Sequence, residues 1–170
     1  MISFRKLTLD DLCFFLEIRN ECRNLLHNNS FFTLKEAEDW YLDQTPEFYI
    51  INYFGENVGY FRTSNFLKHK NSIYIGADLH KKFRGQGIAY YAYIKFINFL
   101  NYEKGIKTFS LEVLSHNKFA IKLYLKLGFQ IINRKKTKTI RVNEYVDNLT
   151  MSLFYEDFRD LNLDNKSSFD

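Results

Sequence analysis

The sequence is poor in residues that mark several structural classes. It has two cysteines, one proline and seven glycines in 170 residues, which excludes a disulfide framework and a collagen-like or proline-rich chain. Cys13 and Cys22 lack the partners of a zinc site and are interpreted as reduced thiols. The longest apolar stretch, Ile88–Leu100, is interrupted by Lys95 and Asn98. It is shorter than the roughly 20 residues of a membrane span, so such a span is excluded.

The composition that remains is typical of one folded domain. Hydrophobic residues make up 46% of the chain and charged residues 26%. We expect the domain to cover residues 1–156 and the polar, aperiodic segment 157–170 to be frayed. Residues 1–8 are not followed by the apolar block of a signal peptide, which favours the cytoplasm. A monomer and a homodimer are both compatible with the sequence.

Positive charge is in slight excess, with 24 basic and 20 acidic residues and a net charge of +4. This excess is compatible with an anionic ligand, but it supports nucleic acid binding only weakly. One local cluster, Lys81, Lys82 and Arg84, precedes a pair of glycines. A second cluster lies in an expected hairpin and is interpreted as a solvated face: Arg134, Lys135, Lys136, Lys138 and Arg141.

Hydrophobic periodicity predicts a mixed α/β fold. Alternating or aromatic-rich segments predict strands at 2–7, 48–54, 58–63, 72–79, 107–114, 129–134 and 148–154. Capping signals at Thr8–Asp11 and Thr33–Glu36 open two early helices, and helical stripes follow at 87–104 and after Asn117. The three strands from 48 to 79 are expected to be antiparallel, and the second half contains a parallel β-α-β crossover.

A glycine-rich segment lies between a predicted strand and a long helix: Arg84-Gly85-Gln86-Gly87-Ile88-Ala89. Glycines allow a tight turn that brings backbone N–H groups close to an oxyanion, and the helix N-terminus adds positive potential. The segment therefore predicts a pyrophosphate-binding loop. It is not a P-loop, and Tyr90 and Tyr91 replace the third glycine of a dinucleotide fingerprint. By itself, a glycine pair between a strand and a helix is as often an ordinary turn as a binding loop.

A second motif follows at Asn117-x-x-Ala120-x-x-x-Tyr124-x-x-x-Gly128-Phe129. With both motifs present, residues 73–132 resemble the Gcn5-related N-acetyltransferase (GNAT) superfamily, whose cofactor signature is Arg/Gln-x-x-Gly-x-Gly/Ala. The resemblance implies a mixed, mostly antiparallel sheet with helices on both faces. It also implies that acetyl-CoA lies in a V-shaped split between strands 72–79 and 107–114.

The resemblance assigns roles to individual residues. The backbone of Arg84 through Ala89 would contact the pyrophosphate, Leu79 and Val113 the pantetheine arm, and Asn117 the cofactor arm as well. Tyr124 resembles the general acid that protonates the departing CoA thiolate, a role that a neutral phenol can perform at neutral pH. Without the motif, Tyr124 would be interpreted as a core aromatic on a helical stripe. The resemblance implies no metal.

Glu112 is the leading candidate for the general base. Strand alternation places it on the face opposite Leu111 and Val113, and it resembles the base position of the ribosomal-protein acetyltransferases. A solvated strand carboxylate explains Glu112 equally well, and Asp78, His116 or a water chain are alternatives. Gly76 suggests a bulge that splays the two central strands. Cys13 and Cys22 are far from the motifs in sequence, which favours direct attack over an acyl-enzyme.

The N-terminal part resembles branches of the family that acetylate sugar-nucleotide amines or protein N-termini, without separating them. Arg19, Arg23 and His27 can contact an anionic substrate, although a solvated helix face explains them as well. We expect an acetyl-CoA-dependent N-acetyltransferase acting on a small primary amine, with an amino sugar or its nucleotide form ahead of a peptide N-terminus. The alternative from another class is a catalytically silent module that binds acyl-CoA or RNA.

Overall fold

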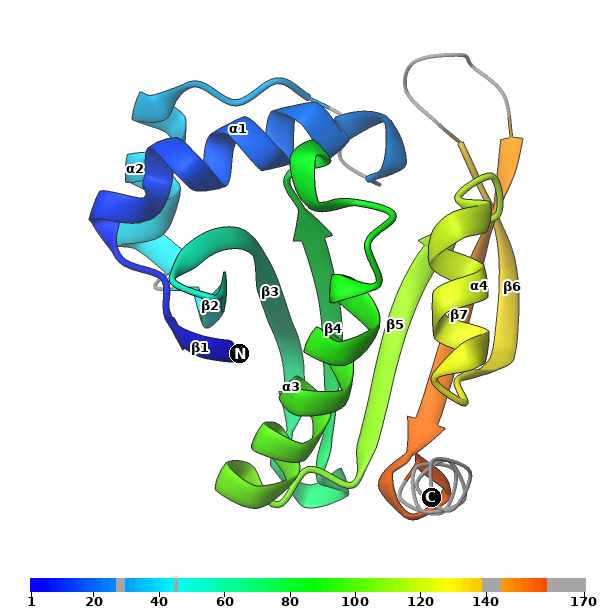
Figure 1. Cartoon of the computed structure of the whole chain (residues 1–170). Helices are drawn as coiled ribbons and strands as arrows, with labels where there is room; N and C mark the ends of the chain where they lie inside the picture. Colours follow the sequence, from blue (N-terminus) through cyan, green and yellow to red (C-terminus); the bar gives the residue numbers. More distant parts are fainter. Residues whose placement is uncertain (27–29, 45, 139–144, 159–170) are drawn as a thin grey trace.

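The computed structural model describes residues 1–26, 30–44, 46–138 and 145–158. The strands are β1 (Ile2–Lys6), β2 (Phe48–Tyr53), β3 (Glu56–Leu67), β4 (Ser72–Leu79), β5 (Thr108–Leu114), β6 (Gln130–Lys138) and β7 (Tyr145–Phe154). The helices named in Figure 1 are α1 (Leu12–Cys22), α2 (Leu34–Gln44), α3 (Ile88–Lys104) and α4 (Lys118–Lys126). The predicted elements are therefore present, with ends that shift by a few residues.

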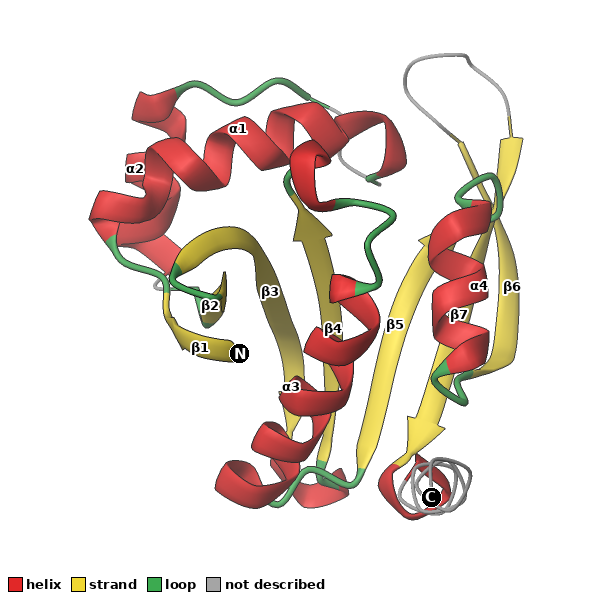
Figure 2. Ribbon diagram, in the orientation of Figure 1, coloured by secondary structure: helices red, strands yellow, loops and turns green. Residues whose placement is uncertain are grey.

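The strands form one sheet in the order β1-β2-β3-β4-β5-β7-β6. Neighbouring strands are antiparallel except β4 and β5, which are parallel. Helix α3 connects these two strands, so the predicted parallel crossover is confirmed (Figure 2).

The early helices begin where the capping signals predict. The Glu36 carboxylate accepts a hydrogen bond from the Thr33 N–H at 2.8 Å, and the Thr33 hydroxyl accepts one from the Glu36 N–H at 3.3 Å. Before α1, the Asp11 carboxylate accepts a hydrogen bond from the Thr8 N–H at 2.9 Å, and a 3-10 turn at Leu9–Asp11 precedes the helix. Helices α1 and α2 both pack over the same half of the sheet (Figure 1).

Helices cover both faces of the sheet, as expected. Successive residues of β2 show the alternation, since Ile50 packs with α1 and α2 whereas Tyr49 and Ile51 pack with α3. In β3, Tyr60 joins the α1/α2 side and Phe61 the α3 side, where it stacks on an aromatic ring of that helix. The sheet therefore separates two cores, and side-chain parity decides which face each functional residue occupies.

Strands β4 and β5 pair over only part of their length. Ser72, Ile73 and Tyr74 are in register with residues 108–110, and the pairing stops there. Beyond this point the strands diverge, as Figure 1 shows for the ends of β4 and β5 that lie nearest α1 and α4. The V-shaped split implied by the family resemblance is therefore present.

The bulge expected at Gly76 is not observed. β4 keeps an uninterrupted register with β3 at this position, where Gly76 pairs with Arg62. A Cβ atom on Gly76 would lie 2.8 Å from Nη2 of Arg62, which is too close for a real contact. A side chain at this position would displace the Arg62 side chain, which crosses the strand there, and the split arises from the end of pairing instead.

Two sequence expectations fall partly outside the described residues. The hairpin of β6 and β7 is antiparallel and carries Arg134, Lys135 and Lys136 with exposed side chains, but Arg141 lies outside the described residues. Of the expected tail, residues 157 and 158 continue a helical turn and Phe158 is buried, whereas 159–170 lie outside the described part. No described helix has both the length and the apolar character needed to cross a membrane.

Candidate active site

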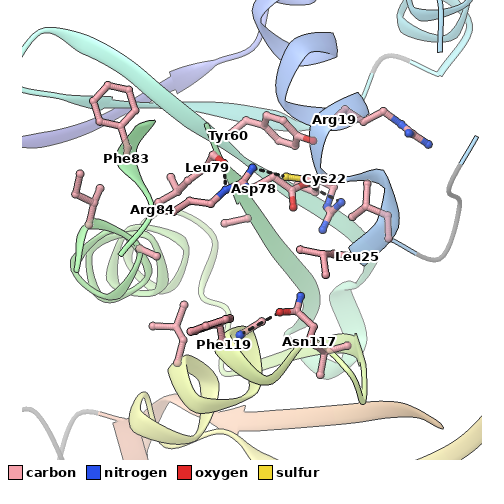
Figure 3. A pocket seen from close by; sticks show the side chains of 18 of the residues that line it. Arg19, Cys22, Leu25, Tyr60, Asp78, Leu79, Phe83, Arg84, Asn117 and Phe119 are labelled. Carbon is pink, nitrogen blue, oxygen red and sulfur yellow. Dashed lines mark hydrogen bonds and ion pairs between the residues drawn. The ribbon is translucent and has the colours of Figure 1, made fainter. Parts of the chain in front are cut away.

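A cavity of about 1150 Å³ opens at the split between β4 and β5 and extends under α1 and α2. It is lined by ten of the eleven predicted site residues; Gln86 is the exception. Figure 3 shows how side chains from β3, β4, α1 and the start of α4 surround it. The structure therefore brings together residues that are up to 45 positions apart in the sequence, such as Leu79 and Tyr124.

The glycine-rich loop presents unused backbone donors to this cavity. Gly85 and Gly87 adopt φ angles of +75° and +77°, a left-handed conformation that favours glycine. The N–H groups of residues 85–89 donate no hydrogen bond to another described residue, since the 3-10 turn ends with the Arg84 N–H donating to Lys81. These five donors at the start of α3 fit an anionic diphosphate.

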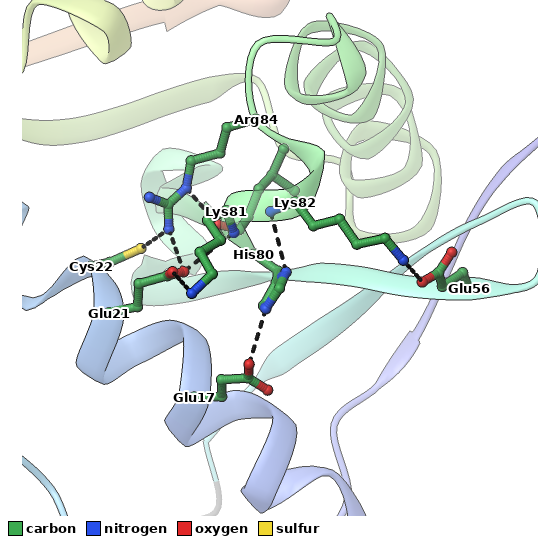
Figure 4. Close-up of polar contacts among 9 residues, drawn as sticks. Glu17, Glu21, Cys22, Glu56, His80, Lys81, Lys82 and Arg84 are labelled. Atoms are coloured by element: carbon green, nitrogen blue, oxygen red, sulfur yellow. Dashed lines mark hydrogen bonds and ion pairs between the residues drawn. The ribbon is translucent and has the colours of Figure 1, made fainter.

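Side chains beside the loop fix its position instead of facing a ligand. Arg84 donates from Nε to the Leu79 carbonyl at 2.9 Å and from Nη2 to Glu21 of α1 at 2.9 Å. Gln86 donates to the Lys82 carbonyl at 2.7 Å, which explains its absence from the cavity wall. Figure 4 shows the contact between Arg84 and Glu21 together with a neighbouring hydrogen bond between His80 and Glu17. The loop is thereby tied to α1.

Tyr124 lies on α4 with its side chain buried, and its hydroxyl is near a second tyrosine. The Tyr93 hydroxyl donates to the Tyr124 oxygen at 3.3 Å, so the Tyr124 proton stays available for donation. Burial raises the pKa of Tyr124 above its usual value, although Tyr93 and Arg62 oppose the shift. Tyr124 is therefore a neutral phenol at physiological pH.

The Glu112 side chain is exposed at the edge of the cavity. It accepts a hydrogen bond from Nδ2 of Asn148 at 3.1 Å. Strand parity confirms that Glu112 faces the α1/α2 side, whereas Leu111 and Val113 belong to the core under α3. Since Tyr124 belongs to the α3 core, the split lies between a carboxylate on one face and a phenol on the other.

The alternative bases occupy different positions. Asp78 lines the cavity and forms an ion pair of 3.0 Å with Arg62. Burial disfavours the charge on Arg62, but Asp78 outweighs this effect and raises the Arg62 pKa. His116 is not part of the cavity wall and contacts the Asn24 carbonyl at 3.3 Å. Of the three side chains, Glu112 and Asp78 therefore line the cavity and His116 does not.

Cys22 is close to the site, contrary to the sequence-based expectation that both cysteines are remote. It lines the cavity, and Arg84 donates to its Sγ atom at 3.1 Å. Burial raises the pKa of the Cys22 thiol to about 12, with Asp78 acting in the same direction. The thiol is therefore protonated at neutral pH and is a weak nucleophile, so direct attack is still favoured.

The sequence did not reveal the inner wall of the cavity. Four aromatic residues, Phe15, Trp40, Phe48 and Tyr60, pack against one another there, with Phe15 and Trp40 stacked at 5.4 Å. Arg19 is also buried in this wall and donates to the Ser30 carbonyl at 2.6 Å.

Two further basic residues are candidates for contact with an anionic substrate. Arg23 lies outside the wall, and His27 lies outside the described residues. Among the described residues, no three or more His, Cys, Asp and Glu side chains gather as a metal site would require.

Comparisons with known proteins agree with this geometry. A model of the acetyltransferase (GNAT) family matches residues 12–129. A search among curated proteins returned no match. Residues 12–129, which contain both motifs, are therefore similar to this family.

Three solved structures illustrate the similarity of the fold. Spermidine N-acetyltransferase from Vibrio cholerae, in complex with CoA and spermine, has a TM-score of 0.83 at 17% identity, covering 93% of this chain and 98% of that one. YncA from Salmonella typhimurium, with its cofactor acetyl-CoA, has 0.74 at 16%, covering 91% and 94%. Ribosomal-protein-alanine N-acetyltransferase from Brucella melitensis has 0.74 at 19%, covering 89% and 99%.

Proposed function

The chain belongs to the acetyltransferase (GNAT) family, and we propose that it transfers an acetyl group from acetyl-CoA to a small primary amine by direct attack in a ternary complex. The observation that carries this proposal is the cavity at the β4–β5 split, which joins the glycine-rich loop, Tyr124 and Glu112.

The glycine-rich loop supports the cofactor part of this proposal. Residues 85–89 supply five backbone donors that no described residue uses, and a Cβ atom on Gly85 would meet no atom within 4 Å. Leu79 and Val113 flank the split and offer apolar contacts to the pantetheine arm. Asn117 caps α4 by accepting from the Ala120 N–H at 3.3 Å, which leaves its amide N–H groups for the cofactor arm.

The catalytic residues act from opposite sides of the split. When bound there, acetyl-CoA supplies the thioester whose carbonyl carbon the amine attacks. Glu112 accepts the proton that the amine loses, and Tyr124 donates its phenolic proton to the sulfur as the carbon–sulfur bond breaks. Tyr93 keeps the Tyr124 oxygen hydrogen-bonded throughout, so that charge developing on Tyr124 is stabilised.

The leading acceptor is a small amine such as an amino sugar or a sugar nucleotide, ahead of a peptide N-terminus. The aromatic wall formed by Phe15, Trp40, Phe48 and Tyr60 supports a compact acceptor, because it closes the inner end of the cavity beneath α1 and α2. A silent acyl-CoA or RNA module is the rival, and Tyr124 and Glu112 at the split count against it.

An acceptor panel tests the function directly. Thiol release from acetyl-CoA should accelerate when the panel contains the correct class of amine, and amino sugars or their nucleotide forms should exceed peptides with free N-termini. Thiol release that accelerates with peptides alone would show that the acceptor is a peptide N-terminus and not an amino sugar. Tight retention of RNA, with acetyl-CoA bound but no amine turned over, would instead favour the silent module.

A further inference from the structure

The inner part of the cavity contains a polar cluster that the proposed reaction does not use. Tyr60 and Arg62 of β3 and Asp78 of β4 line the cavity and lie on the same face of the sheet, since Tyr60 and Asp78 are directly paired. Figure 3 shows the Tyr60 hydroxyl and the Asp78 carboxylate close to one another beside Cys22. Gly76 makes the arrangement possible, because any Cβ atom there would collide with the Arg62 guanidinium.

The polar groups of this cluster have few partners outside the cluster itself. Within the described part of the chain, the buried Tyr60 hydroxyl forms no hydrogen bond, and Oδ2 of Asp78 is held by its ion pair with Nη1 of Arg62 at 3.0 Å. Among the described residues, the Arg62 guanidinium has one polar contact, which is the ion pair with Asp78. Buried polar groups are normally satisfied, so such a cluster facing a cavity is typical of a site that a ligand completes.

The chemistry of the missing partner follows from the donors and acceptors. Asp78 is paired with Arg62 and accepts hydrogen bonds, so it suits the N–H of an amine. Arg62 and Tyr60 offer donors, which suit an oxygen atom. Because Arg62 and Asp78 contact each other at 3.0 Å, the nitrogen and oxygen that they bind lie close together, as they do on neighbouring carbons of a small ligand.

We propose that Tyr60, Arg62 and Asp78 form the acceptor subsite, and that this subsite selects amines bearing an oxygen on the carbon next to the amine-bearing carbon. This inference rests on the proposed acetyl transfer and specifies its acceptor. Amino alcohols, including the amino-alcohol unit of amino sugars, and α-amino amides share this chemistry. Alkyl amines and polyamines lack the oxygen and offer no acceptor to the remaining Arg62 donors or to the Tyr60 hydroxyl, so the subsite rejects them.

Matched amines test the selection. The probes are trans-2-aminocyclohexanol and cyclohexylamine, which differ by one hydroxyl group, together with alaninamide and spermidine. We expect kcat/KM for cyclohexylamine and spermidine to be at least about 100-fold below that for aminocyclohexanol, because a site built to bind an oxygen discriminates strongly against its loss. Comparing aminocyclohexanol with alaninamide then separates a hydroxyl source of the oxygen from a carbonyl source.

Binding is measured separately from turnover. Trp40 is the single tryptophan of the chain and lines the cavity, so its fluorescence reports occupancy in the presence of CoA. Aminocyclohexanol should bind more tightly than cyclohexylamine even if neither is a good substrate. Equal binding and equal kcat/KM for the two amines would overturn the subsite. Absence of acetyl transfer with the binding preference intact would overturn the proposed function alone.

Variants locate the preference in the structure. Tyr60→Phe removes only an unpartnered hydroxyl, so the fold should survive and the discrimination between the two amines should fall roughly tenfold. Arg62→Met leaves the Asp78 carboxylate without its counter-ion and can prevent folding, so Tyr60→Phe is the deciding variant. Tyr74→Phe, on the same strand as Asp78 but outside the cavity wall, is the matched control and should keep the discrimination. Unchanged discrimination in a folded Tyr60→Phe protein would contradict the assignment.

Discussion

Replacing Tyr124 with phenylalanine should lower kcat by roughly 10- to 1000-fold while leaving acetyl-CoA affinity unchanged. The substitution removes one hydroxyl from a buried ring, so packing against Tyr93 and Phe129 is retained. The loss reflects proton donation to the departing thiolate. Steady-state kinetics, together with calorimetric titration of acetyl-CoA, measure the two quantities.

The matched control is Tyr102→Phe, which makes the same chemical change at an exposed position of α3. It should leave both quantities at the wild-type value. A folded Tyr124→Phe protein with normal kcat would show that another group or a water molecule protonates the thiolate. Weakened acetyl-CoA binding would instead identify Tyr124 as a binding residue.

Glu112→Gln provides the contrast between the two proposed catalytic groups. It should depress turnover most at low pH, where the acceptor amine is protonated, and turnover should recover partly as pH rises and free amine accumulates. Tyr124→Phe should lower turnover across the same range, because burial keeps the pKa of Tyr124 raised and the phenol protonated throughout. A Glu112→Gln profile that matches wild type from about pH 6 to 9 would transfer the base role to Asp78 or a water relay.

Gly87→Trp should abolish measurable acetyl-CoA binding or weaken it by at least about tenfold, because the indole obstructs the backbone donors at the start of α3. Gly87 has a φ angle of +77°, and the nearest atom to an added Cβ is 4.0 Å away on Tyr91. The indole would therefore extend into the space that the five backbone donors face. Calorimetric titration measures the affinity.

Gly55→Trp separates backbone strain from obstruction of the loop. Gly55 has a φ angle of +91° with no atom within 4 Å of an added Cβ, and it lies in the turn between β2 and β3, outside the cavity wall. This variant should bind acetyl-CoA normally. If a folded Gly87→Trp protein also bound acetyl-CoA with wild-type affinity, the glycine-rich loop would not be the pyrophosphate site.

Local signals in the sequence predicted the cofactor side of the site. The glycine pair, the helix start at Ile88 and the Asn117 cap each depend on residues a few positions apart, so their spacing survives in the folded chain. The antiparallel strands from 48 to 79 and the parallel crossover followed from the alternation of strand and helix patterns. The position of Tyr124 at the cavity was expected because it belongs to the same spaced motif as Asn117.

The acceptor side depends on tertiary pairing that no local pattern reports. Tyr60 and Arg62 have the alternation of an ordinary strand, and their role emerges only when β3 pairs with β4 and places Asp78 beside them. Gly76 was the available signal, but it was interpreted as a bulge because its neighbour across the strand was unknown. Cys22 was similarly misplaced, since 62 positions separate it from Arg84 in the sequence.

A single-turnover experiment tests direct acetyl transfer most directly. Excess wild-type protein is mixed with acetyl-CoA, its intact mass is recorded, and an acetylatable amine is then added while free thiol and N-acetylated amine are quantified. The structure predicts no acetylated protein before the amine is added and equal amounts of thiol and N-acetylated amine afterwards, because the Cys22 thiol stays protonated with a pKa of about 12. Stoichiometric acetylation of the protein, above all at Cys22, followed by transfer to the amine would contradict direct attack.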